Sequence, residues 1–152
     1  MKSSKTECAA AVVEVVPIVI RHLRAHIRSQ KNPQFTIPQF RVLAYLQLHG
    51  EATLSDLAAS QGVSLPTMSK LVGSLVQRKL VARGGHGEDR RKLKLQLTAE
   101  GARAFDVVMQ STREYVADKL AHFDEAELQR LTESLRSLHA IFEKPRKAKP
   151  EG

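Results

Sequence analysis

The sequence contains little cysteine, few aromatic residues and no tryptophan. Its single cysteine, Cys8, excludes an intramolecular disulfide framework and any zinc site built from several cysteines. Aromatic residues make up 5% of the chain, whereas 42% of the residues are hydrophobic and 26% are charged. These proportions are ordinary for a globular protein and argue against extensive disorder. A chain of 152 residues is long enough to form one domain with a core of its own.

The chain also lacks an apolar run long enough to cross a membrane. The most apolar stretch, from Ala9 to Ile20, is interrupted by Glu14 and Pro17 and is followed by basic residues rather than by a small-residue cleavage site. We therefore expect no membrane partner and a cytoplasmic location. A phosphate-binding glycine loop, an HExxH motif and a nucleophile with an evident base are also missing, so neither an enzyme nor a cofactor is expected.

Acidic residues are scarce relative to basic ones, and the two signs are segregated along the chain. The 24 Lys and Arg residues outnumber the 16 Asp and Glu residues, which gives a net charge of +8. Residues 78–98 contain seven basic and two acidic side chains, whereas residues 99–143 contain five basic and nine acidic ones. This polarity fits a protein that presents one basic edge to a polyanion such as DNA.

Apolar periodicity and helix-start signals predict a mainly α-helical chain. A first helix from Cys8 to Ser29 is apolar on nearly all sides, so we expect a second subunit to cover it and Pro17 to kink it. Its β-branched residues leave a strand open as the alternative. Five further helices are expected to begin after capping residues, namely Thr36, Thr53, Ser64, Thr98 and Asp124.

Two short helices on either side of Gly62 predict a helix-turn-helix, with Val63 turned back into the core. The second helix has apolar residues at the spacing of one buried face. Its other face carries small and hydrogen-bonding residues, so it can approach another surface closely. The candidate DNA contacts on this helix are Ser64, Pro66, Thr67, Ser69, Lys70 and Ser74.

A basic β-hairpin is expected directly after this helix pair. Residues 80–83 and 92–97 are strand-like, and the second run alternates strictly between leucine and basic or polar residues. A glycine-rich, charged loop over residues 84–91 joins them. A helix pair followed by such a hairpin is a winged helix-turn-helix, whose wing tip can place an arginine in the minor groove.

These motifs resemble those of the MarR family of bacterial transcription regulators. The resemblance rests on four segments, Gln39–Leu43, Leu54–Ala58, Glu88–Arg91 and Leu97–Gly101, and covers about residues 36–104. It implies a mainly α (α+β) fold in a single chain, residues 1–152. A winged helix-turn-helix lobe is then expected over residues 36–98, with dimerisation helices over 8–31 and 99–143 and a basic tail over 144–152.

The resemblance also implies a function. It implies a homodimeric, sequence-specific regulator of transcription, of the repressor type, that binds a pseudo-palindromic operator in double-stranded DNA and is released by a small anionic or phenolic effector. By position in the family motif, Arg91 would enter the minor groove and Asp89 would orient it, with Arg90 and Lys92 beside them. Polar residues near the junction of the lobes are the candidate effector site: His22, His26, Arg41 and Tyr45.

Alternative interpretations stay open at this point. Cys8 would carry the signal in a redox-responsive regulator on the same scaffold. A metal-responsive regulator on the same scaffold is another alternative, because His22 and His26 have the spacing of a metal-binding pair, but no third ligand is evident and no metal site is assigned. The winged helix could also serve protein contacts alone, with the basic hairpin acting only as a solvated strand edge.

Overall fold

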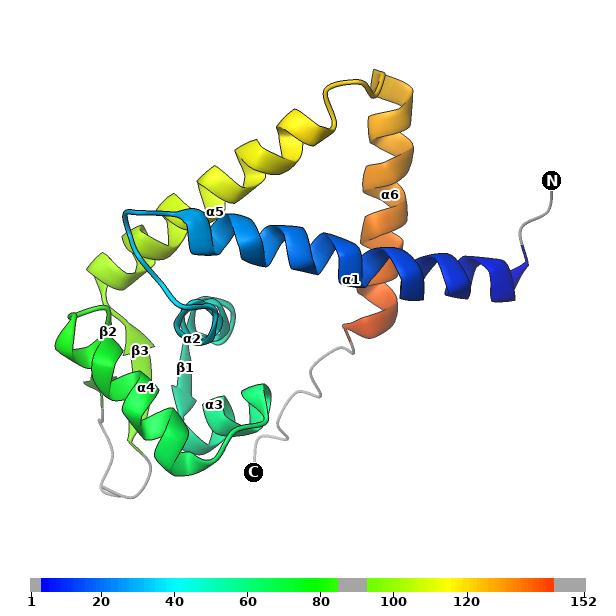
Figure 1. The fold of residues 1–152 in the computed structure, drawn as a ribbon. Helices are drawn as coiled ribbons and strands as arrows, with labels where there is room; N and C mark the ends of the chain where they lie inside the picture. The colour runs from blue at the N-terminus through cyan, green and yellow to red at the C-terminus, as the bar shows by residue number, and fades with distance from the viewer. Residues whose placement is uncertain (1–3, 85–92, 144–152) are drawn as a thin grey trace. The chain divides into compact units, whose positions relative to one another are not determined.

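The chain folds into six α-helices and one three-stranded antiparallel sheet within the described residues (Figure 1). This structure is a computed structural model, and it describes residues 4–84 and 93–143. The expected mainly α fold is therefore confirmed. The chain divides into two compact units, residues 1–114 and residues 115–152. No helix in the described ranges combines the length and apolarity needed to pass through a bilayer.

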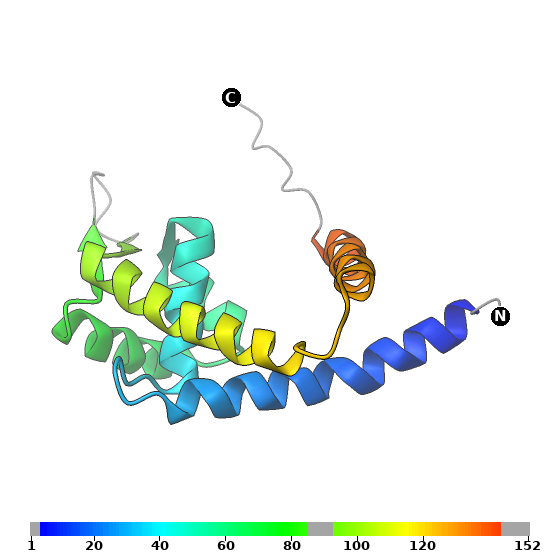
Figure 2. The same cartoon turned by 90° about the horizontal axis from the view of Figure 1, so that it is seen from above.

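The first unit holds the sheet and four complete helices, together with most of a fifth. Its helices are α1 (Lys5–Ser29), α2 (Ile37–His49), α3 (Leu54–Gln61), α4 (Leu65–Gln77) and α5 (Ala99–Lys119), and its strands are β1 (Glu51–Thr53), β2 (Val81–Gly84) and β3 (Lys94–Leu97). The strand order is β1-β3-β2, so β3 is central. The C-terminal part of α1 lies beside α5, where His26 Nε2 and Ser111 Oγ are 3.1 Å apart (Figure 2).

The predicted capping residues begin the helices as expected. Thr36, Thr53 and Asp124 each form a capping box with the residue three positions along, and Ser64 accepts a hydrogen bond from the backbone N–H of Thr67. The first segment is a helix and not a strand, and it continues through Pro17. It begins at Lys5 rather than at Cys8, because Ser4 and Glu7 form a further capping box.

The core of the first unit lies between α2, α3, α4, the sheet and α5. Its fully buried side chains are Val42, Leu43, Leu46, Leu57, Met68, Val72, Leu75, Val81 and Val108. Helix α4 therefore turns one face inward, as its apolar spacing predicts. The helix-turn-helix and the hairpin are thus held by one continuous apolar cluster.

Two apolar residues differ from the sequence-based predictions, since Val63 is expected in the core and Leu93 in a strand. Val63 is 37% exposed, because Gly62 ends α3 in the left-handed conformation and turns the chain toward the N-terminus of α4. Leu93 is 51% exposed, because it precedes β3 and lies outside the paired strand residues. The strand alternation holds for Lys94–Leu97 only.

Two helices keep much apolar surface uncovered within the single chain. In the first unit, the exposed apolar residues of α1 are Val13, Val15, Val16, Ile18, Val19 and Ile20. In the second unit, α6 (Glu125–Phe142) has no buried residue, and Leu135 and Phe142 are 55% and 75% exposed. Contiguous exposed apolar surface of this kind marks an interaction surface.

The start of α5 is fixed against the turn that follows α4. Thr98 donates its backbone N–H to the carbonyl oxygen of Leu80 (3.1 Å), and its hydroxyl donates to the carbonyl oxygen of Lys79 (2.6 Å). The same hydroxyl accepts from the backbone N–H of Gly101 (2.9 Å). A Cβ atom on Gly101 would lie 1.9 Å from the carbonyl oxygen of Leu80. This position therefore requires glycine.

We expect the substitution Gly101→Ala to destabilise the protein. The added methyl group must displace backbone, and such overpacking costs roughly 1–3 kcal/mol of the free energy of unfolding. Gly73→Ala is the matched control, since a Cβ atom there would meet nothing within 4 Å and alanine is the better helix former by about 1 kcal/mol. Thermal unfolding should show a lower midpoint for Gly101→Ala only. Equal midpoints for the two variants would contradict the close contact.

Candidate nucleic-acid interface

The exposed face of α4 carries most of the residues predicted to contact DNA. Pro66, Thr67, Ser69 and Lys70 are all exposed, as is the capping residue Ser64. Ser64 Oγ accepts from the backbone N–H of Thr67 (3.3 Å) and donates to Thr67 Oγ1 (2.9 Å). The structure thus brings these five residues together at one end of the helix, with Met68 buried on the opposite face.

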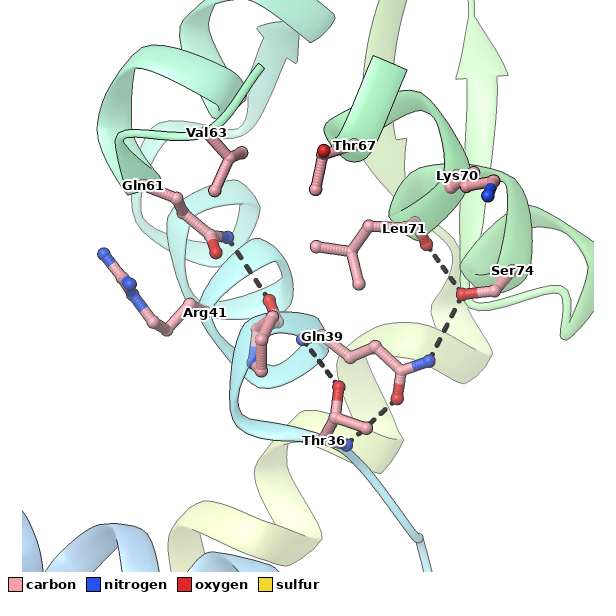
Figure 3. Close-up of a pocket in the computed structure, with 10 residues that line it drawn as sticks. Thr36, Gln39, Arg41, Gln61, Val63, Thr67, Lys70, Leu71 and Ser74 are labelled. Carbon is pink, nitrogen blue, oxygen red and sulfur yellow. Dashed lines mark hydrogen bonds between the residues drawn. The ribbon is translucent and has the colours of Figure 1, made fainter. Parts of the chain in front are cut away.

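A hollow of about 510 Å³ lies beside this face of α4 (Figure 3). It is lined by Thr36, Pro38, Gln39, Arg41, Gln61, Val63, Thr67, Lys70, Leu71 and Ser74. These residues come from the N-terminal half of α2, the end of α3 and the outer side of α4. The exposed Val63 is therefore part of the wall of this hollow.

A chain of hydrogen bonds runs along one wall of the hollow, from α2 to α4 (Figure 3). Gln39 Oε1 accepts from the backbone N–H of Thr36 (3.0 Å), and Gln39 Nε2 donates to Ser74 Oγ (3.2 Å). The Ser74 hydroxyl in turn donates to the carbonyl oxygen of Leu71 (2.7 Å). Ser74 is half-buried, unlike the other candidate contacts on α4.

Arg41 and Lys70 place positive charge on two sides of the hollow, and both side chains are exposed. The guanidinium of Arg41 donates to the carbonyl oxygen of Ser60 at 3.4 Å, a long hydrogen bond that leaves most of its donors available to solvent. Lys70 lies on the same helix as the predicted recognition residues. Both cations are therefore available to an anionic partner.

The base of the predicted wing is present as a two-stranded pairing. Strands β2 and β3 pair antiparallel, with Val81 opposite Leu97 and Gly84 opposite Lys94. Four predicted contact residues, Asp89, Arg90, Arg91 and Lys92, lie outside the described residues. The basic tail over 144–152 lies outside them as well.

The sequence analysis does not predict the short strand β1. A residue of this strand forms an ion pair with a basic residue of the hairpin. Lys94 lies opposite Thr53 in the strand pairing and forms an ion pair with Glu51, at the other end of β1. The hydrogen bond from Lys94 lowers the pKa of the Glu51 carboxyl. At the start of α3, the backbone N–H of Thr53 likewise lowers the pKa of Asp56. Both carboxylates therefore serve local structure.

The four candidate effector residues have different surroundings. His22 is exposed on α1. His26 is half-buried, and its Nε2 atom lies within hydrogen-bond distance of the hydroxyl of Ser111 on α5. Tyr45 packs against His49 on α2, with ring centroids 4.1 Å apart. Only Arg41 of the four lines the hollow.

No cluster of three metal-ligating side chains occurs in the part of the chain that the structure describes. Cys8 is exposed near the start of α1. Sequence reasoning missed Gln39 and Gln61 as residues of the hollow. The spacing of Thr36 and Gln39 is that of a capping box and could have identified Gln39.

Comparison with known proteins identifies similarity to a family of regulators. The family model described as "MarR family" matches residues 34–92. The HTH-type transcriptional regulator YfiV of Bacillus subtilis is 30% identical over 74% of this chain and 70% of its own length. The HTH-type transcriptional repressor MdtR of Bacillus subtilis is 30% identical over 67% of this chain and 66% of its own length.

A solved structure shares the fold. The structure of a MarR family protein from Bacillus stearothermophilus matches with a TM-score of 0.76 and 24% identity, over 93% of this chain and all of that chain. Its fold agrees with the winged-helix arrangement of helices and small sheet found here.

Proposed function

Since the chain belongs to the MarR family and is a DNA-binding transcriptional regulator rather than an enzyme, we propose that it is a cytoplasmic homodimeric repressor. It binds a pseudo-palindromic operator and leaves it when a small effector binds. The observation that carries the proposal is the exposed face of α4, which presents hydroxyl groups and Lys70 to solvent beside the β2–β3 hairpin. The name of the similar protein MdtR, a transcriptional repressor, supports repression.

In the proposed complex, residues 36–98 form the DNA-binding lobe and α4 enters the major groove. Ser64, Thr67 and Ser69 are short side chains whose hydroxyls can meet base edges or phosphates, and the exposed Pro66 lies beside them in the first turn of α4. Lys70 contacts a phosphate as a point charge. The wing reaches the adjacent DNA backbone and minor groove through Asp89, Arg90, Arg91 and Lys92. Of these, Arg91 enters the minor groove.

The proposed homodimer uses the helices over residues 8–31 and 99–143. Its support is the exposed apolar surface on α1 and, separately, on α6. At about 25 cal/mol per Å² of apolar surface removed from water, covering such helices gives a large favourable term for association. Two-fold pairing of the subunits matches a pseudo-palindromic operator, in which each half-site faces one copy of α4.

The proposed effector is an anionic or phenolic small molecule that favours a spacing of the DNA-binding lobes unsuited to successive major grooves. Its candidate residues are His22, His26, Arg41 and Tyr45. Imidazole, guanidinium and phenol groups are suitable partners for a carboxylate or a phenol. The position of Arg41 beside the hollow would couple such binding to α4.

The first test separates the roles of the wing and α4 in DNA binding. Arg91→Ala should weaken operator binding by roughly 1–3 kcal/mol and relax a preference for A·T pairs at the flanks, because a minor-groove arginine reads groove width and potential. Thr67→Ala and Ser69→Ala should instead change which bases are preferred within a half-site. Titrations against a selected operator at two salt concentrations measure these effects. Unchanged affinity of Arg91→Ala would defeat the wing assignment, and no duplex affinity in the parent protein would favour a protein-interaction module.

The second test concerns the oligomeric state. Light scattering at micromolar concentration should give about twice the 16.9 kDa mass of one chain, since the apolar surface of α1 is uncovered in a single subunit. Val13→Glu and Ile18→Glu should shift the particle toward monomer, because each would place a charge in the apolar interface. Gln47→Glu on α2 is a control at an exposed polar position outside both dimerisation segments. A monomeric parent protein would overturn the dimer.

The third test addresses the effector. Binding of an aromatic acid such as salicylate should raise the melting temperature and weaken operator binding, since a ligand that prefers one state stabilises it at the expense of the other. Arg41→Ala and Tyr45→Phe should reduce both effects. If a panel of aromatic acids and phenols changes neither melting temperature nor operator affinity, the effector proposal fails.

A further inference from the structure

Gln39 occupies a position between the two helices that line the hollow. Its side chain leaves the first turn of α2 and reaches α4 at Ser74, one turn beyond Lys70 (Figure 3). The amide oxygen accepts a hydrogen bond at the start of α2, and the amide nitrogen donates one to α4. It is therefore the described side chain whose hydrogen bonds join the start of α2 to the outer side of α4.

The orientation of the Gln39 amide is fixed by its partner on α2. The backbone N–H of Thr36 is a donor and cannot accept, so the amide oxygen must face it. The amide nitrogen is consequently turned toward Ser74 and donates to its hydroxyl oxygen. A reversed amide would set two donors against each other at Thr36. The bond to α4 thus depends on the capping box of α2.

The Ser74 hydroxyl is engaged on both sides by the protein. Its proton is donated to the carbonyl oxygen of Leu71 at 2.7 Å, and one lone pair accepts from Gln39 at 3.2 Å. A hydroxyl has a single proton to donate. While both bonds are present, Ser74 has no proton left for a base acceptor in the major groove.

We propose that Gln39 is a positioning residue for DNA recognition, acting through Ser74 to set the orientation of α4 against α2. The proposal rests on the proposed function, in which α4 reads the operator. It assigns Ser74 to the support of α4 rather than to base contact. Removing the Gln39–Ser74 bond lets α4 shift relative to the core, so that its exposed hydroxyl groups no longer match their base partners.

A double-mutant cycle tests this link. The variants are Gln39→Met, which keeps the length of the side chain, Ser74→Ala, and both together. Two quantities are measured for each: affinity for a duplex selected from a random pool by the parent protein, and affinity for an unrelated duplex of equal length. We expect each single variant to lose about fivefold in operator affinity, with the double variant no weaker than the weaker single one. Affinity for the unrelated duplex should change by less than about twofold, because phosphate contacts are insensitive to sequence.

Matched controls separate this link from a general loss of capping or helix stability. Thr36→Val removes the hydroxyl that caps α2 but leaves the backbone N–H that orients Gln39. Ser60→Ala removes a comparable hydroxyl bond, to the carbonyl oxygen of Leu57 on α3. Both controls should lower the melting temperature and keep the ratio of operator to unrelated-duplex affinity. Ser74→Thr retains the hydroxyl and should keep operator affinity within about twofold of the parent.

Several outcomes would overturn the proposal. Single-variant losses that multiply in the double variant would show that the two residues act independently. A change of base preference at one operator position in Ser74→Ala alone would make Ser74 a direct contact. If the parent protein selects no duplex, the proposed function fails instead, and the melting temperatures of the cycle still test the bond itself. Additive shifts in those temperatures would exclude it.

Discussion

The close packing of Gly101 on the backbone of Leu80 is the constraint on which the arrangement of the first unit depends. It leaves no room for a side chain at the first turn of α5, and Thr98 adds hydrogen bonds to Lys79 and Leu80 at the same place. The turn after α4, the end of β3 and the start of α5 are therefore fixed at one point. Because α4 ends at this turn, the positions of α4 and α5 are linked through backbone contacts.

Helix α4 is consequently supported in two different ways. Its inner face is held by nonpolar packing, since Met68, Val72 and Leu75 are buried in the common core. Its outer side is held by directional bonds, through Gln39 and Ser74. The hydrophobic effect is non-directional, whereas a hydrogen bond between a defined donor and acceptor depends on their orientation. This combination leaves the remaining exposed residues of α4 available to a partner without reducing the stability of the helix.

The sequence predicts local features of this fold well, and it fails where distant segments meet. Capping boxes and apolar spacing identify the helices because both signals act within four residues. The strand β1 has only three residues, and it is defined by its pairing with β3, some forty residues further along the chain. No local sequence pattern therefore predicts it. The predicted burial of Val63 and the predicted place of Leu93 in a strand were wrong for a related reason, since the turn at Gly62 and the strand pairing that begins at Lys94 decide them. The bond between Gln39 and Ser74 joins residues 35 positions apart, and only the half of it that caps α2 leaves a sequence signal.

A basic segment and the exposed apolar residues of α1 lie in different parts of the chain. The segment over residues 78–98 is basic, and residues 99–143 have an excess of acidic side chains. The proposed approach of DNA through the hairpin and α4 agrees with this distribution, because DNA attracts the basic segment and repels the acidic one. The exposed apolar residues of α1 would gain no free energy from contact with phosphates, because phosphates are charged and strongly hydrated. They gain free energy only against another apolar surface, and a second copy of α1 offers one of the same composition. In the proposed function, association of subunits would therefore use the apolar face of α1, and recognition of DNA would use the polar face of α4 and the basic hairpin, which are chemically different parts of the chain.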